Sequence, residues 1–214
     1  MSVTLDDITR YRIVPVVVLN DAANASGLGD ALVAGGLPVA EVTFRTAAAA
    51  DSIKTLAKRD DILVGAGTVR SVAQVEQAVD AGASFIVSPG LSADIVKRSQ
   101  ELGVPVLPGA VTPSEIMLAH GLGLSTVKFF PANVYGGAAA IKGLSAPFGD
   151  TQFIPTGGVN VNNLGEFLGL SCIPAVGGSW MVPAKAVDAG EFDKVTSLTR
   201  EAMELVAQLS GGTK

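Results

Sequence analysis

A lysine in the middle of an apolar run is the first residue of this sequence that could do chemistry. The stretch LSTVKFFPANVYGG, residues 124–137, places Lys128 in a segment that predicts a strand over 125–130. Side chains alternate along a strand, so Lys128 points to one face and its neighbours Val127 and Phe129 point to the other, which must face a helical layer. Burial on the inner side disfavours the ammonium, and a neutral amine forms a Schiff base with a carbonyl compound.

The same alternation singles out a glutamate and an arginine in AEVTFRT, residues 40–46. Glu41 and Arg45 share one face of the predicted strand, and Val42 and Phe44 share the other. Glu41 therefore lies at the depth of the lysine, where it could act as general acid and base, while the arginine lies at the rim. The alternative for Glu41 and Lys128 is a structural ion pair, and the alternative for Arg45 is a solvated charge at the rim.

Eight strand-like runs and the helical patterns between them must position these residues. They begin about every 20 to 27 residues, the spacing of a strand plus a helix, which is typical of a parallel sheet covered on both faces. The expected fold is an α/β (β/α)8 TIM barrel, with a doubly wound open sheet as the alternative. The strands are expected at 13–19, 38–44, 61–67, 84–90, 104–109, 125–130, 151–158 and 172–178. The helices are expected at 22–34, 47–58, 71–81, 92–102, 113–120, 137–146, 161–168 and 191–209.

Length and composition predict one compact domain that binds a small molecule. The 214 residues fit a single domain over 1–214, with a short N-terminal extension at about 1–12. The net charge of −5 and the lack of a basic run argue against nucleic acid and anionic membranes. Apolar runs are too short to span a bilayer and the first residues are acidic, so we expect a cytoplasmic protein. Cys172, the only cysteine, is expected to be a buried structural thiol.

Glycine pairs follow the seventh and eighth predicted strands. TGGVN contains Gly157 and Gly158, and GGSW contains Gly177, Gly178 and Ser179. In many barrels these two loops offer backbone N–H groups to a phosphate. The alternative is that both pairs only form turns.

Metal chemistry has little support in the sequence. The single histidine, His120, ends a predicted helix, where it suits the negative end of the helix dipole. No carboxylate and histidine cluster has the spacing of metal ligands. We therefore expect neither a metal nor another cofactor.

Six motifs together resemble the 2-keto-3-deoxy-6-phosphogluconate (KDPG) aldolase family, which includes the 4-hydroxy-2-oxoglutarate (KHG) aldolases. The resemblance runs from about residue 13 to residue 205. It implies a homotrimeric class I aldolase of the Entner–Doudoroff pathway that cleaves KDPG to pyruvate and glyceraldehyde 3-phosphate. The motifs are AEVTFRT (40–46), VGAGTV (64–69), SPGL (88–91), VKFFPA (127–132), PTGGVN (155–160) and VGGSWMVP (176–183).

The resemblance also implies a role for each matching residue. Lys128 forms the Schiff base, Glu41 shuttles protons and Arg45 holds the pyruvyl carboxylate. The remaining matches are Thr68 beside the carboxylate, Pro89 and Thr156 along the substrate chain, and Gly157, Gly158, Gly177, Gly178 and Ser179 at the phosphate.

One position departs from the family pattern and keeps a second substrate open. Some relatives carry a basic residue just after the first strand that assists the phosphate, and this chain has Asn20 there. The alternative is therefore an aldolase for an unphosphorylated or epimeric 2-keto acid such as 4-hydroxy-2-oxoglutarate. A non-catalytic barrel that binds phosphometabolites is a third possibility. An inward lysine and glutamate argue against it, because a buried ion pair adds little stability.

Overall fold

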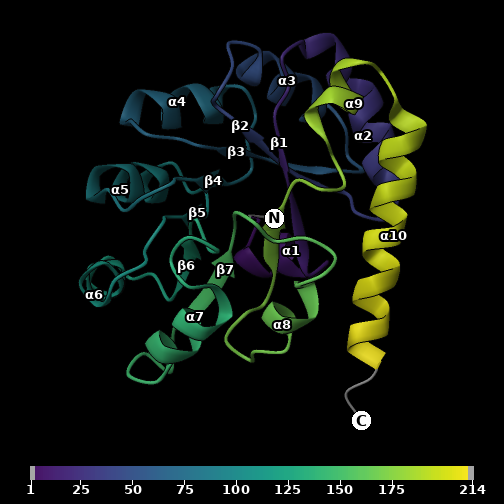
Figure 1. The fold of residues 1–214 in the computed structure, drawn as a ribbon. Helices are drawn as coiled ribbons and strands as arrows, with labels where there is room; N and C mark the ends of the chain where they lie inside the picture. The colour runs from purple at the N-terminus through teal and green to yellow at the C-terminus, as the bar shows by residue number, and fades with distance from the viewer. Residues whose placement is uncertain (1–2, 212–214) are drawn as a thin grey trace.

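The computed structural model describes residues 3–211, in which parallel strands alternate with helices (Figure 1). Every predicted strand is present and lies within its expected range. The strands are β1 (Ile13–Val17), β2 (Val39–Thr43), β3 (Leu63–Gly67), β4 (Ile86–Val87), β5 (Val106–Leu107), β6 (Thr126–Phe129), β7 (Gln152–Pro155) and β8 (Val176–Gly178).

The helices follow the predicted order, with two short additions, α1 and α9, that the sequence patterns did not predict. Strong local signals explain the best matches: α6 begins with a capping box between Thr112 and Glu115 and has Pro113 in its first turn. The helical elements are α1 (Leu5–Thr9), the 3₁₀ turn η1 (Ala22–Asn24), α2 (Ala25–Ala34), α3 (Ala49–Leu56), α4 (Val72–Asp80), α5 (Ala93–Glu101), α6 (Pro113–Gly121), α7 (Gly137–Ser145), α8 (Leu164–Leu168), α9 (Ala184–Asp188) and α10 (Phe192–Gly211).

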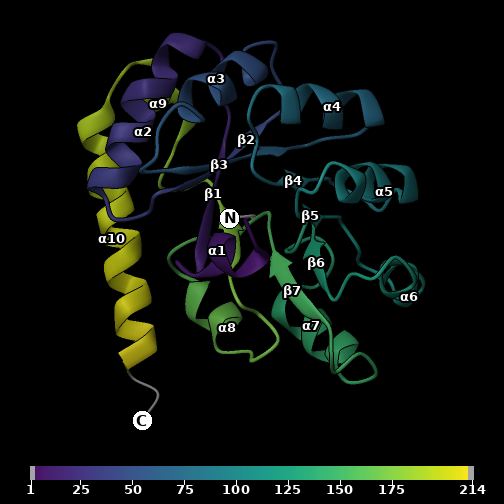
Figure 2. The same ribbon diagram turned by 180° about the vertical axis from the view of Figure 1, so that it is seen from behind.

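The strands form a curled parallel sheet with a barrel-like arrangement. One ladder has the order β5-β4-β3-β2-β1-β8, and a second pairs β6 with β7. Single parallel bridges join the two ladders, from Gly109 to Lys128 and from Thr156 to Gly177. Figures 1 and 2 show the strands gathered in the middle and the longer helices around them. The order of β1 to β5 never reverses, unlike that of a doubly wound sheet.

The outer faces of the strands build the main core. All residues of β1 and β2 are buried, as near-continuous apolar strands between two layers require. Phe129 of β6 and Phe153 of β7 contact each other edge to face, with ring centroids 6.4 Å apart. This apolar layer fixes the register of β6 and so the direction in which its neighbouring side chains point.

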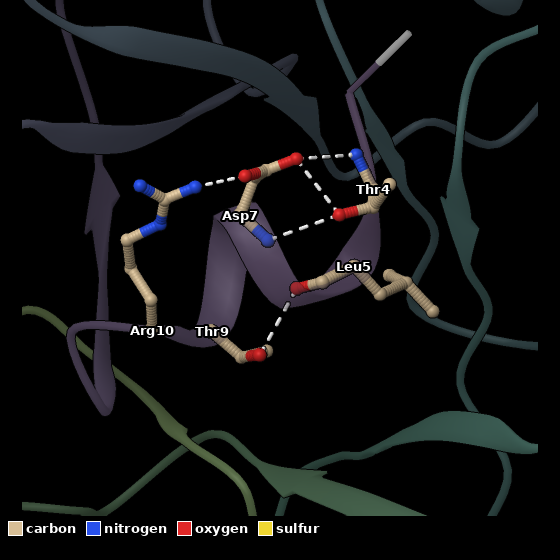
Figure 3. A network of polar contacts seen from close by, with 5 residues as sticks. All are labelled: Thr4, Leu5, Asp7, Thr9 and Arg10. Carbon is tan, nitrogen blue, oxygen red and sulfur yellow. Dashed lines mark hydrogen bonds and ion pairs between the residues drawn. The ribbon is translucent and has the colours of Figure 1, made fainter.

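The N-terminal helix α1 covers the inner space of the sheet at the end where the strands begin. A capping box stabilises it, because Thr4 Oγ1 accepts the Asp7 N–H while the Asp7 carboxylate accepts the Thr4 N–H; Arg10 pairs with the same carboxylate (Figure 3). Leu5 and Ile8 line a small apolar space of about 10 Å³. The expected extension is therefore a short helix that packs into the barrel-like sheet.

The structure also bears on two other predictions, the burial of Cys172 and the lack of a membrane-spanning segment. Cys172 is half-buried against the core, so it is more exposed than the buried thiol that its apolar surroundings predicted. Within residues 3–211, no helix combines the length and the hydropathy needed to cross a membrane.

Candidate active site

Lys128 and Glu41 meet inside the curled sheet. Lys128 Nζ lies 3.0 Å from Glu41 Oε1, and both side chains are almost fully buried, at 6% and 4% exposure. The two residues come from β6 and β2, which are not neighbours, so their side chains meet across the interior. The predicted inward direction and equal depth of this pair are confirmed.

The alternation around Lys128 also agrees with the prediction. Val127 and Phe129 are buried in the outer core, while Phe130 lies on the inner side. Lys128 Nζ is 5.4 Å from the centroid of the Phe130 ring. The ring therefore covers the amine on the side of the open cleft and limits its contact with water.

Glu41 lies against a glycine of the neighbouring strand. Gly67 of β3 has its missing side chain directed at the Glu41 carboxylate, since a Cβ there would come within 2.8 Å of Glu41 Cδ. The register of β2 and β3 brings these residues close, with Thr43 paired to Gly67. The absence of a side chain at Gly67 gives the glutamate the room to reach Lys128.

A cleft of about 270 Å³ opens above this pair, at the end where the strands finish. Thr156 and Gly177 line both the cleft and the small apolar space that also contacts Glu41. The cleft therefore leads toward the buried pair. Of the residues within 3–211 that line the cleft, Arg45 is the only one with a charged side chain, so the cleft suits an anionic ligand.

The two glycine loops form one wall of the cleft. Gly157 and Gly158 follow β7 with φ angles of 94° and 80°, in the left-handed region that glycine adopts readily. The Gly158 N–H makes no hydrogen bond within residues 3–211, whereas the parallel bridge between Thr156 and Gly177 engages the Gly157 N–H. Gly178, the last residue of β8, and Ser179, the residue after it, also line the cleft. Successive N–H groups in such a conformation form an anion-binding concavity.

Two predicted site residues lie near this centre but do not line the cleft. Thr68 directly follows β3 and has φ of 58°, a conformation that is uncommon for a threonine. Pro89 follows β4, and its carbonyl packs against Gly109. Their predicted contacts with substrate remain predictions. Thr156 and Ser179 do line the cleft.

Some cleft residues were not predicted from the sequence. Val16 lies in β1 and Val18 directly follows it; Val182 and Pro183 precede α9, and Ala184 is its first residue. Apolar residues of this kind carry no chemical signal of their own. Alternation in the strand after 13 could have pointed to the first two.

The predicted phosphate neighbour, Asn20, is engaged on the surface. Its Nδ2 donates to Asp188 Oδ2 at 2.8 Å, which ties the loop after β1 to the end of α9. The amide therefore already has a partner. Asn20 is not among the residues that line the cleft.

His120 has a structural environment rather than a metal-like one. It lies in the last turn of α6, as predicted, with Nε2 at 2.8 Å from Thr151 Oγ1 and its ring against Phe148. Among residues 3–211, no group of three or more histidine, cysteine or acidic side chains could hold a metal ion.

Comparisons with known proteins agree with this geometry. A family model described as KDPG and KHG aldolase matches residues 5–198. The 2-dehydro-3-deoxy-phosphogluconate aldolase of Treponema pallidum is 42% identical over 207 residues, which cover 96% of this chain and 99% of the relative.

Two solved structures are also similar along nearly their whole length. The KDPG aldolase of Legionella pneumophila, with pyruvate captured as a covalent carbinolamine, has a TM-score of 0.90 and 36% identity, covering 93% of this chain and 98% of the other. The corresponding aldolase of Zymomonas mobilis ZM4, with 3-phosphoglycerate, has a TM-score of 0.87 and 40% identity, covering 94% and 96%. Taken with the family match, this similarity shows that the chain belongs to the KDPG and KHG aldolase family.

Proposed function

We propose that this protein is a class I aldolase that cleaves KDPG to pyruvate and glyceraldehyde 3-phosphate. One observation carries the proposal: a buried amine, Lys128 Nζ, lies 3.0 Å from the Glu41 carboxylate beneath an open cleft. Desolvation offsets most of the attraction in a buried ion pair, so stability alone is a poor reason for this arrangement. A nucleophile beside a proton carrier is what Schiff-base chemistry requires.

Lys128 supplies the nucleophile. Glu41 takes a proton from the Lys128 ammonium, and the neutral amine adds to the C2 ketone of the substrate to give a carbinolamine. Glu41 then returns that proton to the carbinolamine hydroxyl, which leaves as water and forms an iminium on Lys128. The covalent carbinolamine in the Legionella relative supports this step.

Glu41 next acts on the other side of the bond that breaks. Its carboxylate removes the proton of the C4 hydroxyl, the C3–C4 bond breaks, and the electron pair moves into the iminium to give an enamine. C4 becomes the aldehyde carbon of glyceraldehyde 3-phosphate. Glu41 then protonates C3, and water hydrolyses the resulting iminium, which releases pyruvate and restores Lys128.

The cleft orients the two charged ends of the substrate. Arg45 lies at the rim, where a guanidinium can bind the pyruvyl carboxylate through two parallel hydrogen bonds. The Gly158 N–H and the Ser179 hydroxyl, together with the backbone of Gly157 and Gly178, surround the space for the phosphate. Thr68 and Pro89 complete the proposed substrate contacts near the carboxylate and along the chain.

Borohydride reduction with pyruvate tests the nucleophile directly. The proposal expects a stable adduct on Lys128, located by peptide mass mapping, and KDPG cleavage by the same preparation. Lys128→Met should abolish both, while the exposed Lys142→Met should change neither. An adduct on another lysine, or none, would remove Lys128 from the mechanism.

Asn20 supports a second candidate substrate, an unphosphorylated or epimeric 2-keto acid such as 4-hydroxy-2-oxoglutarate. Asparagine is uncharged and its amide is bonded to Asp188, so position 20 supplies no cation to a phosphate held by the glycine loops. The ratio of kcat/KM for KDPG to that for 4-hydroxy-2-oxoglutarate separates the candidates. A ratio near or below one would reject KDPG as the preferred substrate, and a large ratio would reject the alternative.

The finer architecture is also part of the proposal. The bridges at Gly109–Lys128 and Thr156–Gly177 support an eight-stranded closed (β/α)8 barrel that forms a single domain. Family resemblance supports a cytoplasmic homotrimer. Light scattering coupled to gel filtration would test the trimer, because a monomer and a trimer of this chain differ threefold in mass.

A further inference from the structure

Three asparagine side chains converge on one carbonyl oxygen behind the glycine loop of the cleft. Asn133 Nδ2, Asn160 Nδ2 and Asn163 Nδ2 donate to the Gly158 oxygen at 3.0, 3.1 and 2.9 Å. Asn133 comes from the loop after β6, and the other two come from the loop after β7. A carbonyl oxygen normally accepts one or two hydrogen bonds, so three donors hold the peptide unit that follows Gly158 unusually firmly.

The two preceding carbonyls are held on the same side. The Ala132 N–H donates to the Thr156 oxygen at 2.8 Å, and the Asn133 N–H donates to the Gly157 oxygen at 3.2 Å. The segment after β6 thus binds every carbonyl from Thr156 to Gly158. The Gly158 N–H makes no hydrogen bond within residues 3–211, and both glycines line the cleft.

We infer that Asn133, Asn160 and Asn163 are positioning residues that set the orientation of this glycine loop for the phosphate of the substrate. A peptide unit can present either its N–H or its C=O, and a carbonyl turned into the cleft would repel a phosphate. By holding the Gly158 carbonyl outward, the three amides leave the N–H of the same peptide unit, that of Val159 in the cleft lining, ready for an anion. The inference rests on the proposed function, and it assigns a role to three residues outside the cleft lining.

The three amides are separable by substitution. The Asn133 side chain makes one hydrogen bond within residues 3–211, to Gly158, so its truncation removes a single donor. Asn163 Oδ1 also accepts the Asn160 N–H, so truncation there would disturb the turn before α8 as well. Asn133→Ala is therefore the variant of choice. Asn162 lies in the same loop but donates no side-chain hydrogen bond within the described residues, so Asn162→Ala is the matched control.

The decisive experiment compares two substrates and a half-reaction. One net hydrogen bond between neutral groups changes an equilibrium by about threefold to tenfold, so Asn133→Ala should raise KM for KDPG by that factor with kcat nearly unchanged. The kcat/KM for 4-hydroxy-2-oxoglutarate and the pyruvate concentration that half-saturates borohydride trapping should stay at wild-type values, because neither involves a phosphate. Asn162→Ala should resemble the wild type with both substrates.

A binding measurement separates this inference from the proposed function. Inorganic phosphate can be titrated against the fluorescence of Trp180, the only tryptophan, whose ring packs on Gly178 of the cleft. Weaker phosphate binding in Asn133→Ala, but not in Asn162→Ala, supports the inference even if KDPG is not cleaved. Equal losses with both substrates, or an unchanged KM for KDPG together with unchanged phosphate affinity, would overturn it.

Discussion

The carboxylate of Glu41 fills the space in which a side chain at Gly67 would begin. A Cβ on Gly67 would lie 2.8 Å from Glu41 Cδ and closer still to Oε1, well inside van der Waals contact. Gly67 has an ordinary strand conformation, so the need for glycine here is one of space and not of backbone geometry. The proton carrier of the proposed reaction therefore depends on the residue type of a neighbouring strand.

Gly67→Ala should impair proton transfer without removing the nucleophile. The added methyl group displaces the Glu41 carboxylate from Lys128 without removing it, so kcat for KDPG should fall by about tenfold to a hundredfold, less than the full contribution of general acid and base catalysis. Pyruvate should still be trapped on Lys128. Steady-state rates and adduct yield measure the two effects.

A second glycine at a strand end provides the control for that substitution. Gly90→Ala adds the same methyl group where no atom lies within 4 Å, so its rate should stay close to that of the wild type. Unchanged kcat in Gly67→Ala would show that the glutamate tolerates displacement.

Glu41→Gln should separate the covalent step from turnover. The amide keeps the size of the side chain but cannot carry the proton, so kcat should fall by about 10²- to 10⁴-fold while borohydride still traps pyruvate at Lys128. Single-turnover measurements with KDPG show whether the loss lies in the chemical step. Full activity would exclude Glu41 as the proton carrier.

Ile8→Ala should weaken the fold through α1. Ile8 is 2% exposed and lines the small apolar space that Glu41 also lines, so the truncation should lower the free energy of unfolding by about 2 to 4 kcal/mol. Urea unfolding with an unchanged m-value measures the loss. Ile8→Val should cost about 1 kcal/mol, and an equal loss in both variants would argue against tight packing there.

Arg59→Gln should reduce the loss of stability in acid. Two hydrogen bonds of 2.8 Å from the Arg59 guanidinium lower the pKa of Asp61 below its ordinary value. A lowered folded-state pKa contributes stability that is complete above the unfolded value, about 4, and is lost as the pH falls through the folded value. Unfolding midpoints at pH 6 and pH 3 should therefore differ less in the variant than in the wild type.

A surface arginine provides the comparison for the acid experiment. Arg200 makes no ion pair within residues 3–211, so Arg200→Gln should keep the pH dependence of the wild type. If Arg59→Gln also kept the pH dependence of the wild type, the Arg59–Asp61 contact would make no contribution to the loss of stability in acid.

Strand alternation was sufficient to predict that Glu41 and Lys128 point into the interior of the sheet, because side chains alternate between the two faces of a strand. The same rule could not find α1, which has only five residues, too few for a helical period to emerge. Its capping box at Thr4 and Asp7 was the available signal. The strands themselves proved shorter than their apolar runs, because apolar residues continue into the buried loops at both ends.

The asparagines around Gly158 show a different limit. In a sequence, VNVNN after a glycine pair indicates a turn, since asparagine favours turns wherever it occurs. That Asn133 joins the other two depends on β6 and β7 being neighbours, which local sequence does not report. Likewise the half-buried Cys172 depends on how closely the segment before β8 packs on the core.

The helix that seals the start of the strands leaves one route in and out. Within residues 3–211, Leu5 and Ile8 of α1 pack at the start of the strands, while the cleft opens at the opposite end, so we expect substrate and products to pass the loops there. In the proposed reaction, an aldehyde that enters by that passage can react with the enamine carbon before C3 is protonated and water releases pyruvate. Because a catalyst accelerates both directions, high concentrations of pyruvate and added aldehyde should drive carbon–carbon bond synthesis by mass action through the same passage.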